Sequence, residues 1–335
     1  MSKVAVIGCG SWGTALAQHL SRSGYEVALT GNEPDVLAAI AEKQENTKYF
    51  PGHVLSAPVA VTTLQKTALN GAELVVLAVP SFAMRGVISE AKASLAAGTI
   101  VVSVAKGLEG GTLKTMSGVL SEELGEGWPV AVLSGPSFAL EVLRGLPTAV
   151  TIASRSEETA KKAAVYFHHQ YFRVYTSTDL VGVELGGAVK NIIALAAGVV
   201  DGLGMGNNAR AALITRGVAE MQRLITALGG KPQTVAGLSG LGDLLLTATS
   251  DLSRNRRVGI RLGKGEKLPE IVASLGQVAE AVETASKALD LARQHGISVP
   301  IVEQVDAVLA GRVTAGDAVK SLLAREQRAE DRDLR

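Results

Sequence analysis

The chain has 335 residues, of which 47% are hydrophobic and 19% are charged, so it is long enough and apolar enough to bury the cores of two domains. Its 33 lysines and arginines balance 32 aspartates and glutamates, and the net charge of +1 excludes a broad nucleic-acid or membrane footprint. The single cysteine, Cys9, excludes an internal disulfide framework and is typical of a reducing compartment.

The chain reaches its first strand-like run, Val4–Ile7, so soon after Met1 that no room is left for a secretory leader. The apolar run around Ile192–Val200 is too short and too interrupted by glycine to span a bilayer. We therefore expect a soluble, cytoplasmic protein without stable membrane association.

Strand-like and helical patterns alternate along the first half of the chain. After Val4–Ile7, the spacing predicts a helix over Thr14–Ser23, a strand over Glu26–Leu29 and a helix over Glu33–Lys43. The later predicted strands are Leu74–Val79, Ile100–Val104, Ala131–Ser134 and Ala149–Ile152. This alternation predicts a Rossmann-type, doubly wound α/β fold with a mostly parallel sheet, and purely aliphatic strands are typical of a sheet covered on both faces.

The strand signal disappears beyond about Thr178. Thr314 is a candidate cap for the last helix, and Gly229 and Gly311 stand just past helix ends. Apolar residues recur at helical spacing over Val183–Val200, Ala209–Leu228, Val282–His295, Val299–Leu309 and Ala315–Ala324. We predict a dinucleotide-binding domain over residues 1–178, an all-α, substrate-binding domain over 179–325 and a charged tail over 326–335.

A glycine-rich loop, Gly8-Cys9-Gly10-Ser11-Trp12-Gly13, follows the first strand and opens the first helix. Gly8 permits the tight turn, Gly10 lets the backbone approach a pyrophosphate, and Gly13 allows close helix–strand packing. The helix N-terminus then offers free amides to the phosphates. The loop therefore predicts dinucleotide binding, and Cys9 within it is expected to be a small packing residue and not a catalytic thiol.

The end of the second strand leaves the choice of coenzyme open. An NAD-specific site normally places an acidic residue there to bind the ribose 2′-hydroxyl. Here the tip runs from Thr30 to Asn32, with Glu33 one residue later and no arginine for a 2′-phosphate.

Polar residues follow two further strands. Ligands of open parallel sheets sit beyond the carboxyl ends of the strands, so Lys106 is expected near the cofactor; an ordinary surface lysine is the alternative. The small-residue loop Ser134–Ala139 would let a substrate approach backbone amides.

One charge, Lys190, interrupts the very apolar run Gly186–Gly198. A buried ammonium is costly, and a lysine whose pKa is lowered by burial can exchange protons with a substrate. The alternative is a lysine whose stem lies along a helix with its head in water. Asp243, isolated among glycines and leucines, would need a partner such as a lysine, unless it caps the helix that begins at Leu244.

Three arginines, Arg254, Arg256 and Arg257, fall within four positions after Ser253. In a chain of near-zero net charge they indicate a local anion site, because guanidinium groups match phosphate oxygens; a solvated basic helix start is the alternative.

Six motifs, in chain order, resemble those of the bacterial NAD(P)-dependent glycerol-3-phosphate dehydrogenases: Gly8–Gly13, Lys106–Leu108, Ser134–Pro136, Gly187–Asn191, Gly240–Leu244 and Ser253–Arg256. The resemblance runs from Val4 to about Leu323. It implies reversible reduction of dihydroxyacetone phosphate to sn-glycerol 3-phosphate for glycerophospholipid synthesis, with NADPH or NADH as cofactor.

The resemblance also implies roles for single residues. Lys190 matches the family's proton acceptor, with Lys106 and Asp243 beside it in the catalytic site. The implied substrate contacts are Lys106, Gly135, Ser137, Lys190, Asp243, Ser253, Arg254 and Asn255. The implied cofactor contacts, besides the glycines of the loop, are Ser11, Trp12, Asn32, Tyr49, Lys106, Ala139, Arg254, Val278 and Glu280. Asn32 stands where many relatives carry His or Arg toward the 2′-phosphate, so it departs from the usual NADP pattern.

We expect Lys190 to donate the proton during ketone reduction while Lys106 polarises the carbonyl, and Arg254 and Asn255 to hold the phosphate. An unperturbed lysine has a pKa of about 10.4. Burial and the charge of Lys106 would lower the pKa of Lys190 toward ~7–8, whereas Asp243 opposes that shift and fixes the ammonium.

Two other functions share part of this pattern. A related two-domain dehydrogenase of β-hydroxy acids or phosphosugar acids would share the Rossmann half and the lysine, and its substrate scope would distinguish it. A cofactor-binding redox sensor would need none of Lys190, Asp243 and the arginines, and would carry a recognition module that is not evident. No metal site is expected, and the small-residue-rich helices make a homodimer plausible.

Overall fold

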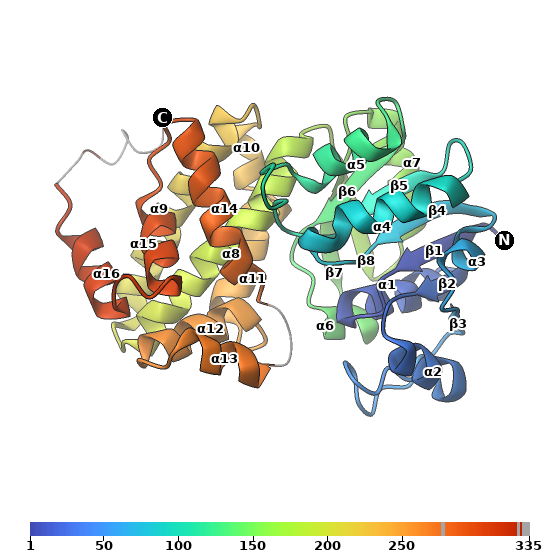
Figure 1. The fold of residues 1–335 in the computed structure, drawn as a ribbon, viewed down its shortest axis with the longest axis horizontal. Coiled ribbons are helices and arrows are strands. Elements are labelled where there is room, and N and C mark those ends of the chain that lie inside the picture. Colours follow the sequence, from blue (N-terminus) through green and yellow to red (C-terminus); the bar gives the residue numbers. More distant parts are fainter. Residues whose placement is uncertain (276–278, 327–328, 330–335) are drawn as a thin grey trace. The chain divides into compact units, whose positions relative to one another are not determined.

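A computed structural model describes residues 1–275, 279–326 and 329 (Figure 1). The chain forms two compact units, Met1–Ala105 with Lys114–Leu180, and Lys106–Leu113 with Val181–Arg335. The sequence had placed Lys106–Leu113 with the first half, whereas its contacts are with the second unit because Leu108 is buried in the helical core. Val278 and most of the expected tail lie outside the described residues.

The first unit contains one sheet with strand order β3-β2-β1-β4-β5-β6-β7-β8. Only β6 and β7 pair antiparallel; the other neighbours are parallel, which confirms the mostly parallel sheet. The strands are β1 (Lys3–Ile7), β2 (Glu26–Thr30), β3 (Ala60–Val61), β4 (Ala72–Leu77), β5 (Ile100–Ser103), β6 (Val130–Ser134), β7 (Thr148–Ala153) and β8 (Phe172–Ser177). β3 and β8 were not predicted, because β3 has two residues and the edge strand β8 carries mostly exposed or half-buried residues.

Helices cover both faces of this sheet (Figure 1). The helices are α1 (Ser11–Arg22), α2 (Pro34–Lys43), α3 (Gln65–Leu69), α4 (Met84–Ala91), α5 (Met116–Leu124), α6 (Ala139–Leu143) and α7 (Glu157–Phe167). Alternate residues of one strand enter different cores: Val4 and Val6 pack with α1 and α7, whereas Ala5 and Ile7 pack with α4 and α5. The aliphatic strands are therefore buried on both faces, as predicted.

The regular secondary structure of the second unit is helical in its described residues, which confirms the all-α half. The helices are α8 (Leu180–Gly202), α9 (Gly206–Ala227), α10 (Pro232–Val235), α11 (Asp243–Thr249), α12 (Arg254–Gly263), α13 (Leu268–Leu275), α14 (Glu280–Gln294), α15 (Pro300–Leu309) and α16 (Ala315–Leu323), with a π-turn at Leu238–Gly242. The hydroxyl of Thr314 accepts the Asp317 amide and caps α16, as predicted. Helices α10 and α13 were not predicted, and α11 and α12 were weighed only as alternatives, as the helix that begins at Leu244 and the basic helix start after Ser253. Helix α10 has only four residues, too few to show an apolar period.

Helix α8 corrects one sequence argument. With 23 residues it is long and apolar enough to cross a membrane by length and composition alone, because it begins well before Ile192. Its most apolar window is, however, 94% buried inside the protein. Burial by the surrounding helices, and not shortness, therefore makes α8 the central helix of the second core.

Glycines bring α8 and α12 into backbone contact. A Cβ on Gly259 of α12 would lie 2.0 Å from the Leu195 carbonyl oxygen, and one on Gly202 of α8 would lie 2.2 Å from the Ile260 carbonyl oxygen. Gly198 and Gly263 are equally crowded. This close packing places the first turn of α12 against α8.

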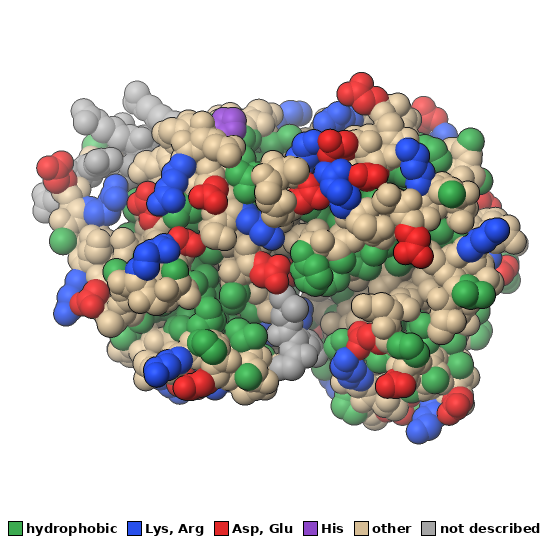
Figure 2. All heavy atoms as spheres, viewed as in Figure 1, with side chains coloured by type: hydrophobic (Ala, Val, Ile, Leu, Met, Phe, Trp, Pro, Cys, Tyr) green, Lys and Arg blue, Asp and Glu red, His purple; other side chains and the backbone are tan. Residues whose placement is uncertain are grey.

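Acidic and basic side chains are interspersed over the viewed surface of both units (Figure 2). This mixture agrees with the near-zero net charge. Any concentration of charge is therefore local, in small clusters of side chains within a unit.

Candidate active site

Lys190 lies on α8 in the second unit and is only 4% exposed. Its Nζ lies 3.1 Å from Asp243 Oδ1 and donates a hydrogen bond to Thr247 Oγ1 at 2.6 Å. The other oxygen of the same carboxylate, Oδ2, accepts from Lys106 Nζ at 2.7 Å. One buried carboxylate thus holds two ammonium groups.

Local packing explains why these groups meet. Asp243 is the first residue of α11, and Thr247 stands four residues later on the same helix face. The preceding π-turn needs glycine, because a Cβ on Gly240 would lie 2.2 Å from a backbone oxygen. That turn contacts α8 at Gly186, one helical turn before Lys190, so the carboxylate faces the amine.

The electrostatics of the cluster lower two pKa values. Burial lowers the pKa of Lys190 to about 8, with the nearby charge of Lys106 acting in the same direction and Asp243 against it. Burial by itself would raise the pKa of Asp243, but the two ammonium groups outweigh it and lower that pKa. Near neutrality the carboxylate is therefore ionised, and the Lys190 amine can both give and take a proton.

A second polar chain begins at the neighbouring residue, Asn191. Its amide donates to Glu280 Oε2 at 2.8 Å, and its Oδ1 accepts from Asn255 Nδ2 at 2.9 Å. Asn255 Oδ1 in turn accepts the Ala281 amide at 3.1 Å. Buried amide groups thus tie α8, α12 and the start of α14 together beside Lys190.

The predicted arginine cluster is divided by the fold. Arg256 is buried and pairs with Asp201 and Asp251, so it serves the packing of α12 and is not an open anion site. The Ser253 hydroxyl caps α12 by accepting the Arg256 amide. Arg254 is half-buried and Arg257 is exposed, so only these two remain accessible to an anion.

The glycine loop in the first unit fits a dinucleotide pyrophosphate. Gly8 has φ +116°, and a Cβ there would lie 2.3 Å from the Ala78 carbonyl oxygen. A Cβ on Gly13 would lie 1.7 Å from the Gly8 oxygen, whereas one on Gly10 would meet nothing within 4 Å. Gly10 therefore faces open space at the N-terminus of α1, as a phosphate site requires, and two glycines of the loop are needed for packing.

The end of β2 and the residues that follow it, Thr30 to Glu33, lie beside this glycine loop. Asn32 is exposed, and Tyr49 is half-buried with its hydroxyl donating to Glu33 Oε1 at 2.8 Å. Lys48 pairs with the same carboxylate. Cys9 is buried, and burial raises the pKa of its thiol, so it remains a packing residue.

The loop after β6 also lies in the first unit. Gly135 has φ +141°, and the hydroxyl of Ser137 donates to its carbonyl oxygen at 2.9 Å. Ala139 is the first residue of α6. The predicted site residues therefore fall into two sets, with Lys106, Lys190, Asp243, Ser253, Arg254, Asn255 and Glu280 in the second unit and the other described ones in the first.

Sequence reasoning missed Thr247 and Asn46. Thr247 could have been found from its position four residues after Asp243 in a short apolar helix. Asn46 is fully buried, and no local pattern distinguishes it from an ordinary loop asparagine. The described residues contain no group of three or more His, Cys, Asp and Glu side chains that could hold a metal.

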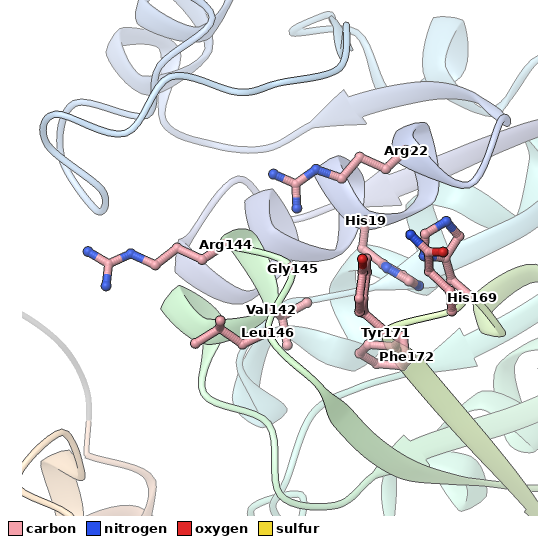
Figure 3. Close-up of a pocket in the computed structure, with 10 residues that line it drawn as sticks. His19, Arg22, Val142, Arg144, Gly145, Leu146, His169, Tyr171 and Phe172 are labelled. Carbon is pink, nitrogen blue, oxygen red and sulfur yellow. The ribbon is translucent and has the colours of Figure 1, made fainter.

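A pocket of about 390 Å³ lies in the first unit, away from the predicted residues (Figure 3). His19 and Arg22, near the C-terminal end of α1, line it together with Arg144 and His169. None of its lining residues belongs to the predicted site. Arg22 donates to Ser56, and Arg144 donates to a histidine, so both side chains hold neighbouring loops.

Comparison with known proteins points to one family. Residues 3–160 match the model of the NAD-dependent glycerol-3-phosphate dehydrogenase N-terminus, and residues 179–320 match that of its C-terminus. The chain is 51% identical to glycerol-3-phosphate dehydrogenase (NAD(P)+) of Moorella thermoacetica, over 98% of this chain and 97% of the relative. It is 48% identical to that of Geobacillus kaustophilus, over 100% and 98%.

Solved structures agree. The crystal structure of glycerol-3-phosphate dehydrogenase from Coxiella burnetii has a TM-score of 0.93 at 42% identity and covers 97% of this chain and 99% of that one. A Mycobacterium tuberculosis 3-hydroxyisobutyrate dehydrogenase has a TM-score of 0.54 at 13% identity, covering 97% and 100%. At that identity the second likeness shows a shared fold alone.

Proposed function

Because the chain belongs to the NAD-dependent glycerol-3-phosphate dehydrogenase family, we propose that Lys190 is the general acid and base of its reaction. The protein is an NAD(P)-dependent oxidoreductase, a glycerol-3-phosphate dehydrogenase, and NADH or NADPH is its cofactor. The single observation that carries the proposal is the buried Lys190 amine, 3.1 Å from the carboxylate that also holds Lys106.

The bound coenzyme supplies the hydride that reduces carbon 2 of dihydroxyacetone phosphate. Lys190 donates a proton to the oxygen on that carbon, is left neutral, and recovers a proton from solvent. In the reverse direction the neutral amine accepts the hydroxyl proton of sn-glycerol 3-phosphate. A pKa of about 8 suits both directions, because neither form of the amine is scarce near neutrality.

Lys106 and Asp243 have different tasks in this proposal. The Lys106 ammonium polarises the carbonyl and stabilises the charge that develops on its oxygen. Asp243 positions both amines, and Thr247 fixes the direction of Lys190 by accepting its hydrogen bond. Charge-assisted bonds of this kind hold side chains at the short range that proton transfer needs.

We assign the phosphate of the substrate to Arg254 and Asn255 at the start of α12. Arg254 is half-buried, and one amide hydrogen of Asn255 is left after its bond to Asn191. The Ser253 hydroxyl accepts the Arg256 amide and so holds that helix start, and a hydroxyl that accepts one bond can still donate its hydrogen to the phosphate, as the family motif implies.

The coenzyme is assigned to the first unit. The loop Gly8–Gly13 would hold the pyrophosphate, with Ser11 and Trp12 at the N-terminus of α1. Asn32 and Tyr49 would face the adenosine ribose. The roles of Gly135, Ser137 and Ala139 as ligand contacts follow from the family motifs.

Replacing Lys190 tests the central assignment. Lys190→Met keeps the length and apolar stem but removes the proton carrier, so kcat in both directions should fall ~10²–10⁴-fold. Coenzyme binding, measured by nicotinamide fluorescence, should stay near that of the native protein. Lys161→Met, at an exposed surface lysine, is the matched control. A Lys190→Met enzyme with near-native kcat would rule out the assignment.

We also propose a cytoplasmic homodimer whose product feeds glycerophospholipid synthesis. The near-zero net charge of the chain and the burial of α8 support a protein that works away from membranes. Light scattering of the purified protein would give the oligomeric state, and a monomer at all concentrations would contradict the dimer. Depleting the protein in cells should lower newly made glycerophospholipid, measured by labelled glycerol-backbone incorporation.

A further inference from the structure

Asn46 joins the glycine loop to the segment that follows α2. It is fully buried, and its Nδ2 donates to the Cys9 carbonyl oxygen at 3.1 Å and to Thr14 Oγ1 at 2.7 Å. Its Oδ1 accepts the Tyr49 amide at 3.1 Å. A buried side chain with three such bonds fixes the relative position of the two segments that it joins.

The tip of β2 is fixed to the same loop. The Gly8 amide donates to the Thr30 carbonyl oxygen at 2.7 Å. A Cβ on Gly31 would lie 2.5 Å from Cys9 Sγ, so the chain passes directly over the loop at this point. Glu33, two residues later, is therefore held close to the phosphate-binding loop.

Glu33 is the N-cap residue of α2, but its side chain makes no capping hydrogen bond. Its carboxylate instead accepts from Tyr49 Oη at 2.8 Å and pairs with Lys48. Burial would raise the pKa of Glu33, but these two donors lower it, so the group is ionised near neutrality. The Glu33 side chain is 25% exposed and that of Lys48 is 54% exposed, which leaves both within reach of a ligand.

These contacts decide what the ribose 2′ position would meet. An ionised carboxylate at the end of the second strand can accept a 2′-hydroxyl, whereas a 2′-phosphate would be repelled by it. The Lys48 ammonium forms an ion pair with the Glu33 carboxylate, which therefore occupies this cation. A 2′-phosphate would gain Lys48 only by breaking that pair.

We propose that Glu33 and Lys48 are the coenzyme-selecting pair of this chain, that together they favour NADH over NADPH, and that Asn46 positions them against the glycine loop. The inference rests on the proposed function in one respect, the binding of the coenzyme at that loop. Beyond that function, the proposal names the coenzyme that the protein selects and the residues that select it.

Coenzyme binding, measured in the absence of substrate, tests the Glu33–Lys48 pair directly. Dissociation constants for NADH and NADPH are measured by nicotinamide fluorescence at fixed ionic strength. The native protein should bind NADH at least about tenfold more tightly, as a single unfavourable charge contact implies. Glu33→Gln removes the repulsion and frees Lys48, so the NADPH to NADH ratio of dissociation constants should fall at least about tenfold.

Three further variants separate the contributions of Glu33, Lys48 and Asn46. In Glu33→Gln with Lys48→Gln, NADPH binding should weaken again, because no freed cation remains. Lys43→Gln, at an exposed lysine of α2, removes the same charge nearby and should leave the ratio unchanged. Asn46→Asp has nearly the same shape but lacks the amide donors, so the selecting pair should lose its position: NADH binding should weaken more than NADPH binding, and the ratio of dissociation constants should move toward one. Equal weakening of both coenzymes would contradict the positioning role.

The possible results test the selecting pair, the role of Asn46 and the proposed function separately. A native protein that binds NADPH as tightly as NADH, or a Glu33→Gln ratio equal to the native one, overturns the selecting pair. A folded Asn46→Asp protein with native affinity for both coenzymes overturns the positioning role. A native protein that binds neither coenzyme contradicts the proposed function itself, so the two failures are distinguishable. Glu33 and Lys48 are partly exposed, so their variants keep the test available even if Asn46→Asp does not fold.

Discussion

The charge cluster around Lys190 makes a prediction in which two substitutions act in opposite directions. Asp243 raises the pKa of Lys190 and Lys106 lowers it, against a background of burial that lowers it to about 8. Asp243→Asn should therefore lower the pKa of Lys190 further, and Lys106→Met should raise it. Ketone reduction needs the protonated amine, so its rate falls as the pH rises through that pKa.

The distances give the size of the effect. Across the 3.1 Å between Lys190 Nζ and Asp243 Oδ1, Coulomb's law at an effective dielectric constant of about 20 gives ~5 kcal/mol. Because Lys106 and Thr247 can rearrange around a neutral asparagine, the net shift should be smaller, about 1–3 pKa units. The descending limb of reduction should move down by that amount in Asp243→Asn.

The assay is kcat/KM for dihydroxyacetone phosphate at saturating coenzyme, followed by nicotinamide absorbance across the pH range. At saturating coenzyme this ratio reports the pKa of the enzyme–coenzyme complex before the substrate binds. The oxidation of sn-glycerol 3-phosphate should show the mirror-image limb, since it needs the neutral amine. Even a strongly reduced rate is enough for this comparison, because the variants are compared by the pH at which the rate falls and not by the rate itself. If Asp243→Asn and Lys106→Met shift the limb in the same direction, or not at all, the electrostatic assignment is wrong.

Three further predictions concern packing, pH and the coenzyme loop. Gly259→Ala should lower the free energy of unfolding by ~1–3 kcal/mol, because its Cβ would lie 2.0 Å from a carbonyl oxygen of α8. Gly86→Ala, on an open helix face, is the control and should change that free energy by less than ~1 kcal/mol in the same urea titration. Glu220 caps α15 from α9, and burial raises its pKa to about 7, so the native state holds a proton between pH 4.5 and 7 that the unfolded chain has lost. The stability from this proton is fully present below pH 4.5 and is lost as the pH rises through 7. Over that window the free energy of unfolding of the native protein should fall by ~3 kcal/mol relative to that of Glu220→Gln. Parallel curves of unfolding free energy against pH for the two proteins would contradict this. Gly13→Ala should weaken both coenzymes at least about tenfold by displacing Gly8, and unchanged dissociation constants in the folded variant would contradict the loop assignment.

Much of the fold was predictable because its signals are local. The run Val4–Ile7 with the following glycines predicts a strand, a phosphate-binding turn and a helix within one short segment, and β1 and α1 confirm the strand and the helix. Longer helices such as α9 and α14 were located to within a few residues by their apolar period. Edge strand β8 was missed because a strand with one neighbour and many exposed residues lacks the apolar run that marks a central strand.

The composition of the candidate site was also readable in part. An isolated Lys190 in an apolar run and an isolated Asp243 among glycines each indicated a buried charge in need of a partner. The family resemblance led us to expect that Asp243 fixes the Lys190 ammonium, and the structure places the two groups 3.1 Å apart. That Lys106 shares the same carboxylate was not predicted. The sequence also suggested an arginine cluster at Arg254–Arg257, of which Arg256 is occupied by aspartates.

By itself, the sequence indicated most of the element types, the dinucleotide loop and a candidate for a desolvated amine, because each depends on residues that are neighbours along the chain. Only the tertiary structure decided that Lys106 and Lys190 meet at one carboxylate, that Thr247 orients the amine, and that Asn46 ties the glycine loop to Glu33. These contacts join residues far apart in the sequence. Their geometry is set by close packing such as that between α8 and α12, which no local period encodes.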